Sequence, residues 1–252
     1  MSGRVAIVTG AASGIGHAIS VRLAEEGARV ACLDVDPSGA VATAAEIGGR
    51  SFPVRADVTD EDQVCAAVGE VVGTAGVIDV LVNNAGIAGP QERAEATPAN
   101  GWDRTHAVNL RGAFLLAKHA VEHLVRRQGT IVNIASALAF VGWPSECAYG
   151  PSKAGVVQLT KGLALDYAPA VRVNCVCPGA VRTPMITSVL EGAPHMEAAL
   201  ADYGQIHPLR HRLALPREIA DAVLFLASDD ASFITGAALP VDGGFLAGGH
   251  GA

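Results

Sequence analysis

Residues 4–16 have the sequence RVAIVTGAASGIG, and this stretch decides the fold class of the chain. Its first part, RVAIVT, is a short run rich in β-branched residues, which predicts a buried strand. The glycine-rich turn that follows leads into a helical pattern that continues through Glu26. A strand joined to a helix through a glycine turn is the beginning of an alternating α/β chain.

The rest of the chain continues this alternation. Further strands are predicted at 29–34, 51–56, 79–83, in the run GTIVNIAS that ends at Ser136, at 171–179 and at 236–241. Helices are predicted in an Ala-rich stretch to Ile47, at about 60–72 with Thr59 as N-cap, at about 102–127, around Tyr149 and Lys153, and at 216–228. Strands separated by helices need crossover connections. We therefore expect residues 1–252 to form a single-domain, doubly wound Rossmann fold, an α/β fold whose seven-stranded parallel sheet has helices on both faces.

One long region, residues 180–215, departs from this pattern and contains only a short predicted helix at 194–203. Connections of this length in compact domains are usually lids or binding loops, or else disordered. We expect this one to be the substrate-binding loop region.

Composition limits the partners. The chain of 252 residues is 50% hydrophobic and carries a formal net charge of -7, so no basic field exists to attract phosphates. We expect neither nucleic acid nor an anionic membrane as partner. No secretory signal precedes the first strand and no apolar run reaches the length of a membrane span, so the expected setting is the reducing cytoplasm.

The cysteines and histidines give no sign of a metal site. The five cysteines, Cys32, Cys65, Cys147, Cys175 and Cys177, are odd in number and have no C-x-x-C spacing, which predicts small buried hydrophobic residues. Cys147 stays open because it lies two residues before Tyr149, where a side chain that faces the substrate is an alternative. His195, His207 and His211 lack paired spacing and are predicted to be loop histidines.

Gly10, Gly14 and Gly16 lie between the first strand and the first helix. Glycines there permit a tight turn and a close approach of the backbone to a pyrophosphate at a helix N-terminus. The spacing is G-x-x-x-G-x-G and not the G-x-G-x-x-G fingerprint, and a plain turn with a tight packing contact is the alternative interpretation.

Asp34 indicates which dinucleotide would bind. It ends the second strand about twenty residues beyond the glycines, where a carboxylate accepts hydrogen bonds from the adenosine ribose and repels a 2′-phosphate. Its neighbours Leu33 and Val35 carry no positive charge, so NAD is favoured over NADP. Asp57 ends the third strand, where it contacts the adenine or serves the following turn.

Tyr149 and Lys153 stand four residues apart, which places both side chains on one face of a helix. An ammonium beside a phenol favours the phenolate, and lowering a tyrosine pKa by roughly three units takes about 4 kcal/mol. Ser136 follows a predicted strand, so its hydroxyl is expected at the carboxyl edge of the sheet, where α/β sheets bind ligands.

The ordered set of motifs resembles the classical short-chain dehydrogenase/reductase family. These motifs are TGAASGIG, NNAG at 83–86, Ser136 with Tyr149 and Lys153, PGAVRT at 178–183 and VDGG at 241–244. The resemblance covers essentially the whole chain. It implies that Tyr149 is the general acid/base, that Lys153 lowers its pKa and holds the nicotinamide ribose, and that Ser136 binds the substrate oxygen.

The resemblance also implies a fourth catalytic residue, Asn109, which shapes its helix and holds a water that leads protons to the lysine, and a structural role for Asn83. The cofactor residues that follow from the motifs are Gly10, Ser13, Gly14, Ile15, Gly16, Asp34, Asp57, Val58, Asn84, Ala85, Gly86, Tyr149, Lys153, Pro178, Gly179, Val181 and Thr183.

The sequence leaves the substrate open. Candidate substrate contacts are Ser136, Leu138, Trp143, Glu146 and Met185. Trp143 and Met185 are equally well explained as core or interface residues. Glu146 binds a hydroxyl or amine of the substrate, or is a solvated turn residue.

The expected activity is that of an NAD-dependent oxidoreductase that interconverts a secondary alcohol and a ketone by hydride transfer. One alternative is a non-catalytic NAD(H)-binding sensor or scaffold protein, which predicts a broken catalytic set. Another is a sugar epimerase or dehydratase, which needs a larger substrate domain. The resemblance further implies a homotetramer, with the helix at 102–127, the Tyr149 helix and the C-terminal tail FLAGG at its interfaces.

Overall fold

A parallel sheet forms the centre of the computed structural model, which describes residues 1–48, 51–190 and 195–248. Within these ranges the sheet has seven strands in the order β3-β2-β1-β4-β5-β6-β7. The strands are β1 (Val5–Thr9), β2 (Arg29–Asp34), β3 (Phe52–Arg55), β4 (Val80–Asn83), β5 (Thr130–Ile134), β6 (Arg172–Pro178) and β7 (Ala238–Val241). The order reverses between β1 and β4, so the predicted doubly wound fold is confirmed.

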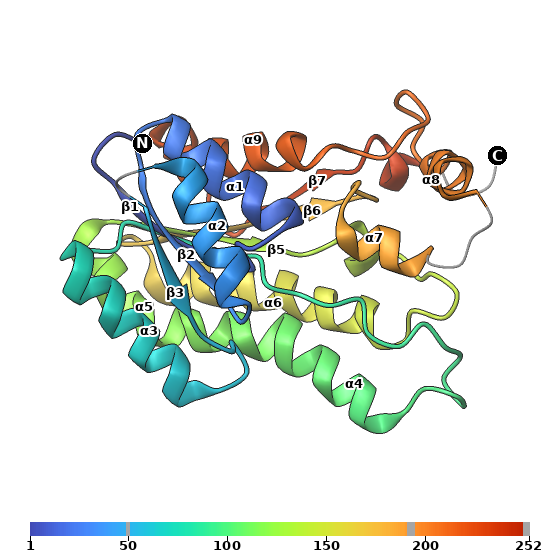
Figure 1. Cartoon of the computed structure of the whole chain (residues 1–252), viewed down its shortest axis with the longest axis horizontal. Coiled ribbons are helices and arrows are strands. Elements are labelled where there is room, and N and C mark those ends of the chain that lie inside the picture. Colours follow the sequence, from blue (N-terminus) through green and yellow to red (C-terminus); the bar gives the residue numbers. More distant parts are fainter. Residues whose placement is uncertain (49–50, 191–194, 249–252) are drawn as a thin grey trace.

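Helices cover both faces of the sheet, as Figure 1 shows. On one face lie α1 (Gly14–Glu25), α2 (Pro37–Ile47) and α9 (Pro216–Ala227). On the other lie α3 (Glu61–Ala75), α5 (Gly112–Arg127) and α6 (Tyr149–Tyr167). Short 3₁₀ turns, η2 (Ala137–Ala139), η3 (Asp229–Ala231) and η4 (Phe245–Ala247), complete the connections.

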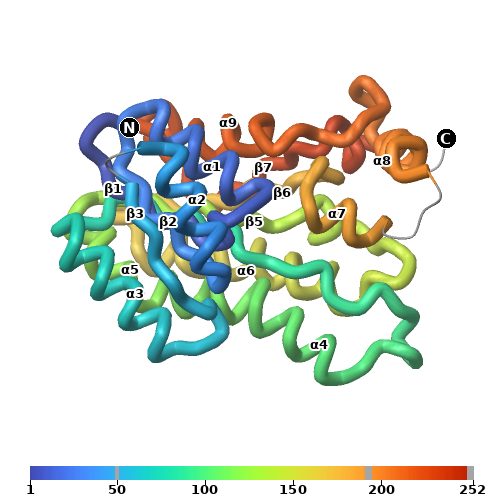
Figure 2. The backbone as a smooth tube through the Cα atoms, in the orientation of Figure 1, coloured from blue at the N-terminus to red at the C-terminus, as the bar shows by residue number. Residues whose placement is uncertain are grey.

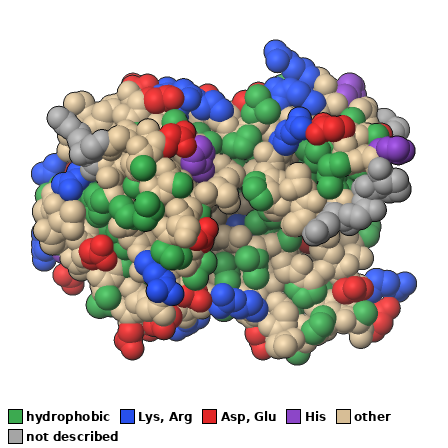
Figure 3. All heavy atoms as spheres, viewed as in Figure 1, with side chains coloured by type: hydrophobic (Ala, Val, Ile, Leu, Met, Phe, Trp, Pro, Cys, Tyr) green, Lys and Arg blue, Asp and Glu red, His purple; other side chains and the backbone are tan. Residues whose placement is uncertain are grey.

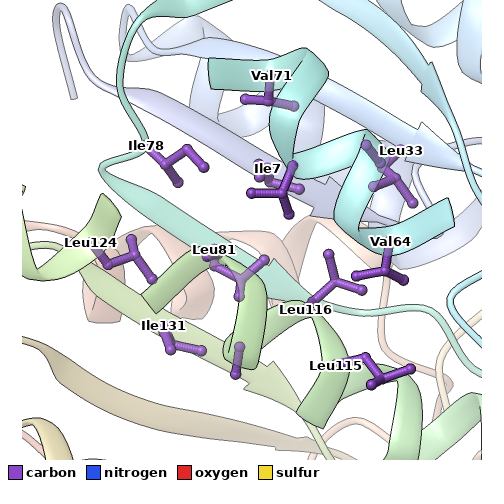
Figure 4. Close-up of a cluster of buried hydrophobic side chains, with 14 of the residues drawn as sticks. Ile7, Leu33, Val64, Val71, Ile78, Leu81, Leu115, Leu116, Leu124 and Ile131 are labelled. Carbon is purple, nitrogen blue, oxygen red and sulfur yellow. The ribbon is translucent and has the colours of Figure 1, made fainter. Parts of the chain in front are cut away.

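The core is divided by the sheet into two large apolar clusters. Figure 4 shows the cluster between the sheet and helices α3 and α5, where Ile7, Leu81 and Ile131 from three strands meet Val64 and Leu116 from the helices. All five side chains are fully buried. Because the strands of a parallel sheet are buried on both faces, they have nearly continuous hydrophobic sequences instead of alternating ones.

The long helix predicted at 102–127 is interrupted. It consists of α4 (Ala99–His106), a π-helical segment η1 (Ala107–Arg111) and α5. The interruption surrounds Asn109, whose side-chain amide donates to the carbonyl of Ile87 at 3.0 Å and accepts from the amide of Ile87 at 2.8 Å. A π-bulge of this kind is frequent at functional sites.

Helix α3 and its N-cap each begin one residue later than predicted. Asp60 is the N-cap, and its Oδ1 accepts from the backbone amides of Asp62 and Gln63. Thr59, the predicted cap, instead donates its hydroxyl to Asp57 Oδ1 at 2.7 Å. Threonine and aspartate are both common N-cap residues. Asp60 caps α3 because the hydroxyl of Thr59 is already bound to Asp57.

The region 180–215 contains two helices, α7 (Pro184–Val189) and α8 (Met196–Gly204). Figure 2 shows both at one end of the molecule, away from the N-terminus. Only α8 was predicted, and its expected first residue, Pro194, lies outside the described residues. The signal for α7 is Pro184 at the first helical position, which proline favours.

None of the helices within the described ranges has the length and apolar character needed to cross a membrane. Nor do the described side chains of histidine, cysteine, aspartate and glutamate gather in any group that could hold a metal ion.

Candidate active site

A long cavity lies at the carboxyl ends of the strands, where the order of the sheet reverses. Figure 3 shows the molecule hollowed near the middle of this face, between the side that carries α1 and α2 and the side that carries α7 and α8. The predicted residues that line the cavity are Gly10, Ser13, Gly14, Ile15, Asp34, Asp57, Val58, Asn84, Ala85, Gly86, Ser136, Tyr149, Lys153, Pro178, Gly179, Val181, Thr183 and Met185.

The glycine turn brings the backbone of β1 and α1 close together. Gly10 has φ +65° and Gly14 has φ +57°, conformations that glycine adopts without cost. A side chain at Gly16 would collide with the carbonyl oxygen of Gly10. Gly16 does not line the cavity in the described part of the chain, so its place is that of a packing contact.

The N-terminus of α1 points to the same cavity. Ser13 is its N-cap and makes no side-chain cap hydrogen bond within the described residues. The first amides of a helix lack partners inside the helix and carry partial positive charge. This end of α1 therefore suits an anion such as a pyrophosphate.

Asp34 is held in place by backbone amides. Its Oδ2 accepts from Ala12 at 2.9 Å and its Oδ1 accepts from Asp36 at 3.0 Å. Each carboxylate oxygen has a second lone pair, so the group can still accept hydrogen bonds from hydroxyls in the cavity.

Asp57 stabilises the turn that follows β3, which is one of the two roles predicted for it. Its Oδ1 accepts from the amide of Thr59 at 2.9 Å, and its Oδ2 is 3.3 Å from Arg104 Nη2. Burial raises the pKa of Asp57, but the hydrogen bonds of Thr59 and the charge of Arg104 outweigh it and hold the pKa below its usual value. Arg104 also lines the cavity, and the sequence analysis missed it because it lies on α4, far from Asp57 in sequence.

Asn84 and Ala85 tie the end of β4 to the end of β1. Asn84 Nδ2 donates to the carbonyl of Thr9 at 2.9 Å, and the Thr9 hydroxyl accepts from the amide of Ala85 at 2.9 Å. Directly before Asn84, the last residue of β4, Asn83, donates its Nδ2 to Asn133 Oδ1 at 2.9 Å and links β4 to β5. The bonds of Asn84 and Ala85 to Thr9 lie at the point between β1 and β4 where the strand order reverses.

Ser136, Tyr149 and Lys153 come together at the far end of the cavity. The Ser136 hydroxyl accepts from the amide of Leu138 at 3.1 Å and hydrogen-bonds with the Tyr149 phenol. Lys153 is 3% exposed and donates to the carbonyl of Ile134 at 2.9 Å. Its ammonium nitrogen is 5.7 Å from the centre of the Tyr149 ring.

The pKa of Tyr149 departs from the expectation. Burial raises it to about 12, and the hydrogen bond of Ser136 opposes burial only in part. Burial also lowers the pKa of Lys153 to about 8. The expected lowering of the phenol pKa by Lys153 is therefore absent from this structure: burial and the nearby Glu146 raise the pKa, the Ser136 hydrogen bond alone lowers it, and the lysine charge contributes nothing.

Asn109 lies behind this group and does not line either cavity within the described residues. Its Nδ2 donates to Ser152 Oγ at 3.0 Å, which connects the π-helical segment to α6. A Cβ at Gly86 would lie 3.2 Å from Asn109 Oδ1 and 3.3 Å from Lys153 Nζ. Gly86 therefore packs tightly against both side chains.

His207 lies in a loop, as predicted, but its side chain is buried. It is 2% exposed, its Nε2 accepts from the amide of Ala180 at 3.0 Å, and its Nδ1 is 2.8 Å from the carbonyl of Arg212. Burial lowers its pKa, as expected for an imidazole that must stay neutral to accept a hydrogen bond. His207 thus holds the segment after β6, whereas His195 and His211 are exposed.

A second, smaller cavity adjoins the first and shares Ser136 and Tyr149 with it. All the other predicted substrate residues, Leu138, Trp143, Glu146 and Met185, line this second cavity. Further residues that no sequence motif marks also line it, among them Gln91, Val189, Tyr203, Ile206 and Phe245. They come from separate segments that only the fold brings together.

The cysteines follow the prediction only in part. Cys32, Cys175 and Cys177 are buried, but Cys65 is exposed on α3. Cys147 is partly buried, and its Sγ lies 3.1 Å from Thr97 Oγ1. It is not among the residues described along the second cavity.

Comparison with known proteins fits this arrangement. Residues 10–246 match the family model described as enoyl-(acyl carrier protein) reductase. The chain is 43% identical to 2-(R)-hydroxypropyl-CoM dehydrogenase of Xanthobacter autotrophicus, over 97% of this chain and 99% of that protein. The chain belongs to the short-chain dehydrogenase/reductase family.

Other members of the short-chain dehydrogenase/reductase family are similarly close. Cis-4-hydroxycyclohexanecarboxylate dehydrogenase of Sinomonas cyclohexanicum is 44% identical, over 97% of each chain. The structure of 3-ketoacyl-(acyl-carrier-protein) reductase from Brucella melitensis, complexed with NADH, superposes with a TM-score of 0.89 at 37% identity, over 97% of this chain and 98% of that one. The protein is therefore an oxidoreductase that acts on CH–OH groups, in a family whose members bind nicotinamide cofactors.

Proposed function

We propose that the protein is an NAD-dependent dehydrogenase/reductase that interconverts a secondary alcohol and a ketone, with Tyr149 as general acid/base. The observation that carries this proposal is the position of Ser136 and Tyr149. Both line the long cavity with the glycine turn, and both line the smaller, mostly apolar cavity beside it. A cofactor in the first cavity and a substrate in the second would therefore meet at these two side chains.

The long cavity fits a dinucleotide. The N-terminus of α1 would bind the pyrophosphate, and Asp34 would accept hydrogen bonds from the adenosine ribose. A carboxylate at that position repels a 2′-phosphate, and the nearby cation Arg104 is already bound to Asp57 and Thr59. These contacts favour NAD. When bound, the nicotinamide supplies the hydride chemistry.

The protein's own residues handle the proton. In reduction, the Tyr149 phenol donates its proton to the forming alkoxide, and in oxidation the phenolate takes the proton of the substrate hydroxyl. Ser136 hydrogen-bonds the same substrate oxygen. With a pKa of about 12, Tyr149 holds its proton at neutral pH, which is the form that reduction requires.

Lys153 and Asn109 would act behind Tyr149. Lys153 would bind the nicotinamide ribose and supply positive charge to the phenolate, and Asn109 keeps α6 and the segment after β4 in register. Asn109 would also hold a water that leads protons to the lysine.

The remaining proposals concern the whole molecule. We propose a single domain over residues 1–252, with the region 180–215 as its substrate-binding loop region, and a cytoplasmic location. The partners would be a small-molecule substrate and three further copies of the chain, with no nucleic acid and no membrane. The tetramer is supported by large apolar side chains left exposed on α5, α6 and η3 to β7, namely Phe114, Leu165 and Phe233.

The test is a panel of secondary alcohols and ketones assayed with NAD(H) and NADP(H) by cofactor absorbance. Turnover of at least one pair with NAD(H) is expected. Protein that binds NAD(H) but turns over nothing on a broad panel would instead support a redox sensor.

A further inference from the structure

Glu146 lines the second cavity and is not a fully solvated turn residue. It is partly buried, and its Oε2 is buried without a hydrogen-bond partner among the described residues. Its Oε1 accepts from Gln91 Nε2 at 2.8 Å. A buried carboxylate with one oxygen unpaired is costly, so it calls for a partner that the described chain does not supply.

The backbone positions Glu146 toward the reacting end of the cavity. Ser145 has φ +64°, a left-handed conformation that a serine seldom adopts. The carbonyl of Glu146 accepts from the amide of Gly150 at 3.1 Å, next to Tyr149. The carboxylate is close enough to Tyr149 and Tyr203 for its charge to act on both phenols.

The chemistry of the lining limits the ligand. Among the residues described along this cavity, Glu146 is the one carboxylate, and no lysine, arginine or histidine is present. Most of the other walls are apolar or aromatic, with Trp143, Tyr203 and Phe245 among them. An anionic group would meet an uncompensated negative charge here, whereas a hydrogen-bond donor would satisfy it.

We infer that Glu146 binds a second hydrogen-bond donor on the substrate, a hydroxyl or an ammonium group, separate from the carbinol that reacts at Tyr149. The substrate class is then a diol, polyol or amino alcohol and not a hydroxy acid. The exposed Gln91 amide moves aside or shares the carboxylate when the donor arrives. This inference rests on the proposed function for the identity of the reacting group.

A set of compounds with one ring isolates this contact. Cyclohexanol offers no second group, cyclohexane-1,4-diol offers a hydroxyl, 4-aminocyclohexanol offers an ammonium, and cis-4-hydroxycyclohexanecarboxylate offers an anion. In the wild type, kcat/KM for the diol or the amino alcohol should exceed that for cyclohexanol by about tenfold or more. The hydroxy acid should be the poorest of the four.

Two variants separate the possible donors. Glu146→Leu removes the acceptor, so the ratio of kcat/KM for the donor compounds over cyclohexanol should fall about tenfold or more. Glu146→Gln keeps an acceptor without the charge, so a preference for the hydroxyl survives in part and a preference for the ammonium is lost. Glu92→Gln, which alters a carboxylate outside the second cavity, should leave the ratios unchanged.

The outcomes separate this inference from the proposed function. An equal kcat/KM for all four compounds, a preference for the hydroxy acid, or an unchanged ratio in Glu146→Leu would overturn the role of Glu146 while leaving the dehydrogenase in place. If nothing in the panel turns over, binding of the same compounds is measured by calorimetry. Tighter binding of the donor compounds in the wild type but not in Glu146→Leu supports the subsite, and equal binding refutes it.

Discussion

The ammonium nitrogen of Lys153 lies 5.7 Å from the centre of the Tyr149 ring, and the carbonyl of Ile134 holds it there through a 2.9 Å hydrogen bond. Burial acts on the two groups in opposite directions. It raises the pKa of Tyr149 to about 12 and lowers that of Lys153 to about 8, so each group is biased toward its neutral form.

Tyr149→Phe should lower kcat/KM by about 10²- to 10⁴-fold, because it removes the group that exchanges the proton and nothing else. Binding of NADH, measured by fluorescence titration, should change little. Tyr167→Phe is the matched control, since Tyr167 lies on the same helix and lines neither cavity in the described part of the chain. Turnover retained in Tyr149→Phe would sink the assignment of the acid/base.

The wild type should bind NADH at least about tenfold more tightly than NADPH, because the Asp34 carboxylate repels a 2′-phosphate. Asp34→Asn should reduce this preference through weaker repulsion of NADPH. The measurement is the dissociation constant of each cofactor. Asp36→Asn is the control, because Asn still caps α2 and Asp36 does not line the cavity within the described residues. A wild type that prefers NADPH would show that the role of Asp34 was misjudged.

Lys153 should give the protein a specific pH dependence of stability. Below pH of about 8 the folded chain bears the full cost of a buried ammonium. Between about 8 and 10.5, the usual pKa of lysine, the unfolded chain keeps the proton that the folded chain has lost, so stability rises with pH. Relative to Lys153→Met, the free energy of unfolding of the wild type should increase by up to about 3 kcal/mol from pH 7 to pH 10.

Urea denaturation at several pH values measures this difference. Lys161→Met, an exposed substitution on the same helix, should show no such trend. A difference between wild type and Lys153→Met that stays constant over the range would mean that the buried amine is not destabilised by its surroundings.

His207 should make the protein sensitive to acid. Burial lowers its pKa below the usual 6.5, so under acidic conditions the unfolded chain binds a proton that the folded chain resists. Stability supplied by the neutral imidazole is therefore lost as the pH falls below about 6.5. His207→Gln should be less stable by about 1 kcal/mol at pH 7.5 through a lost hydrogen bond, and should lose less stability on going to pH 5.5.

Thermal or urea unfolding of the variant at both pH values provides the comparison. The exposed His195→Gln serves as control. An equal acid response in wild type and His207→Gln would contradict the role of His207 as a neutral acceptor for Ala180.

The sequence by itself determined the alternation of strands and helices, the glycine turn and the motifs that lie at strand ends. Those features depend on short-range patterns, and parallel strands place their carboxyl ends at one edge, so Asp34, Ser136 and the glycine turn had to meet there. The four-residue spacing paired Tyr149 with Lys153 on one face of a helix, and the family resemblance gave the two residues their roles.

The tertiary structure alone decided burial and long-range partners. It broke the helix at Asn109, buried His207 and exposed Cys65. It also decided that the pKa of Tyr149 is raised and not lowered, since desolvation depends on every segment packed around the phenol. The contact between Gln91 and Glu146 joins residues 55 apart in sequence, and no local pattern specifies which distant side chain will face a carboxylate. The proposed reaction can be inferred from short motifs in the sequence, whereas the substrate cavity is lined by separate segments that only the fold brings together.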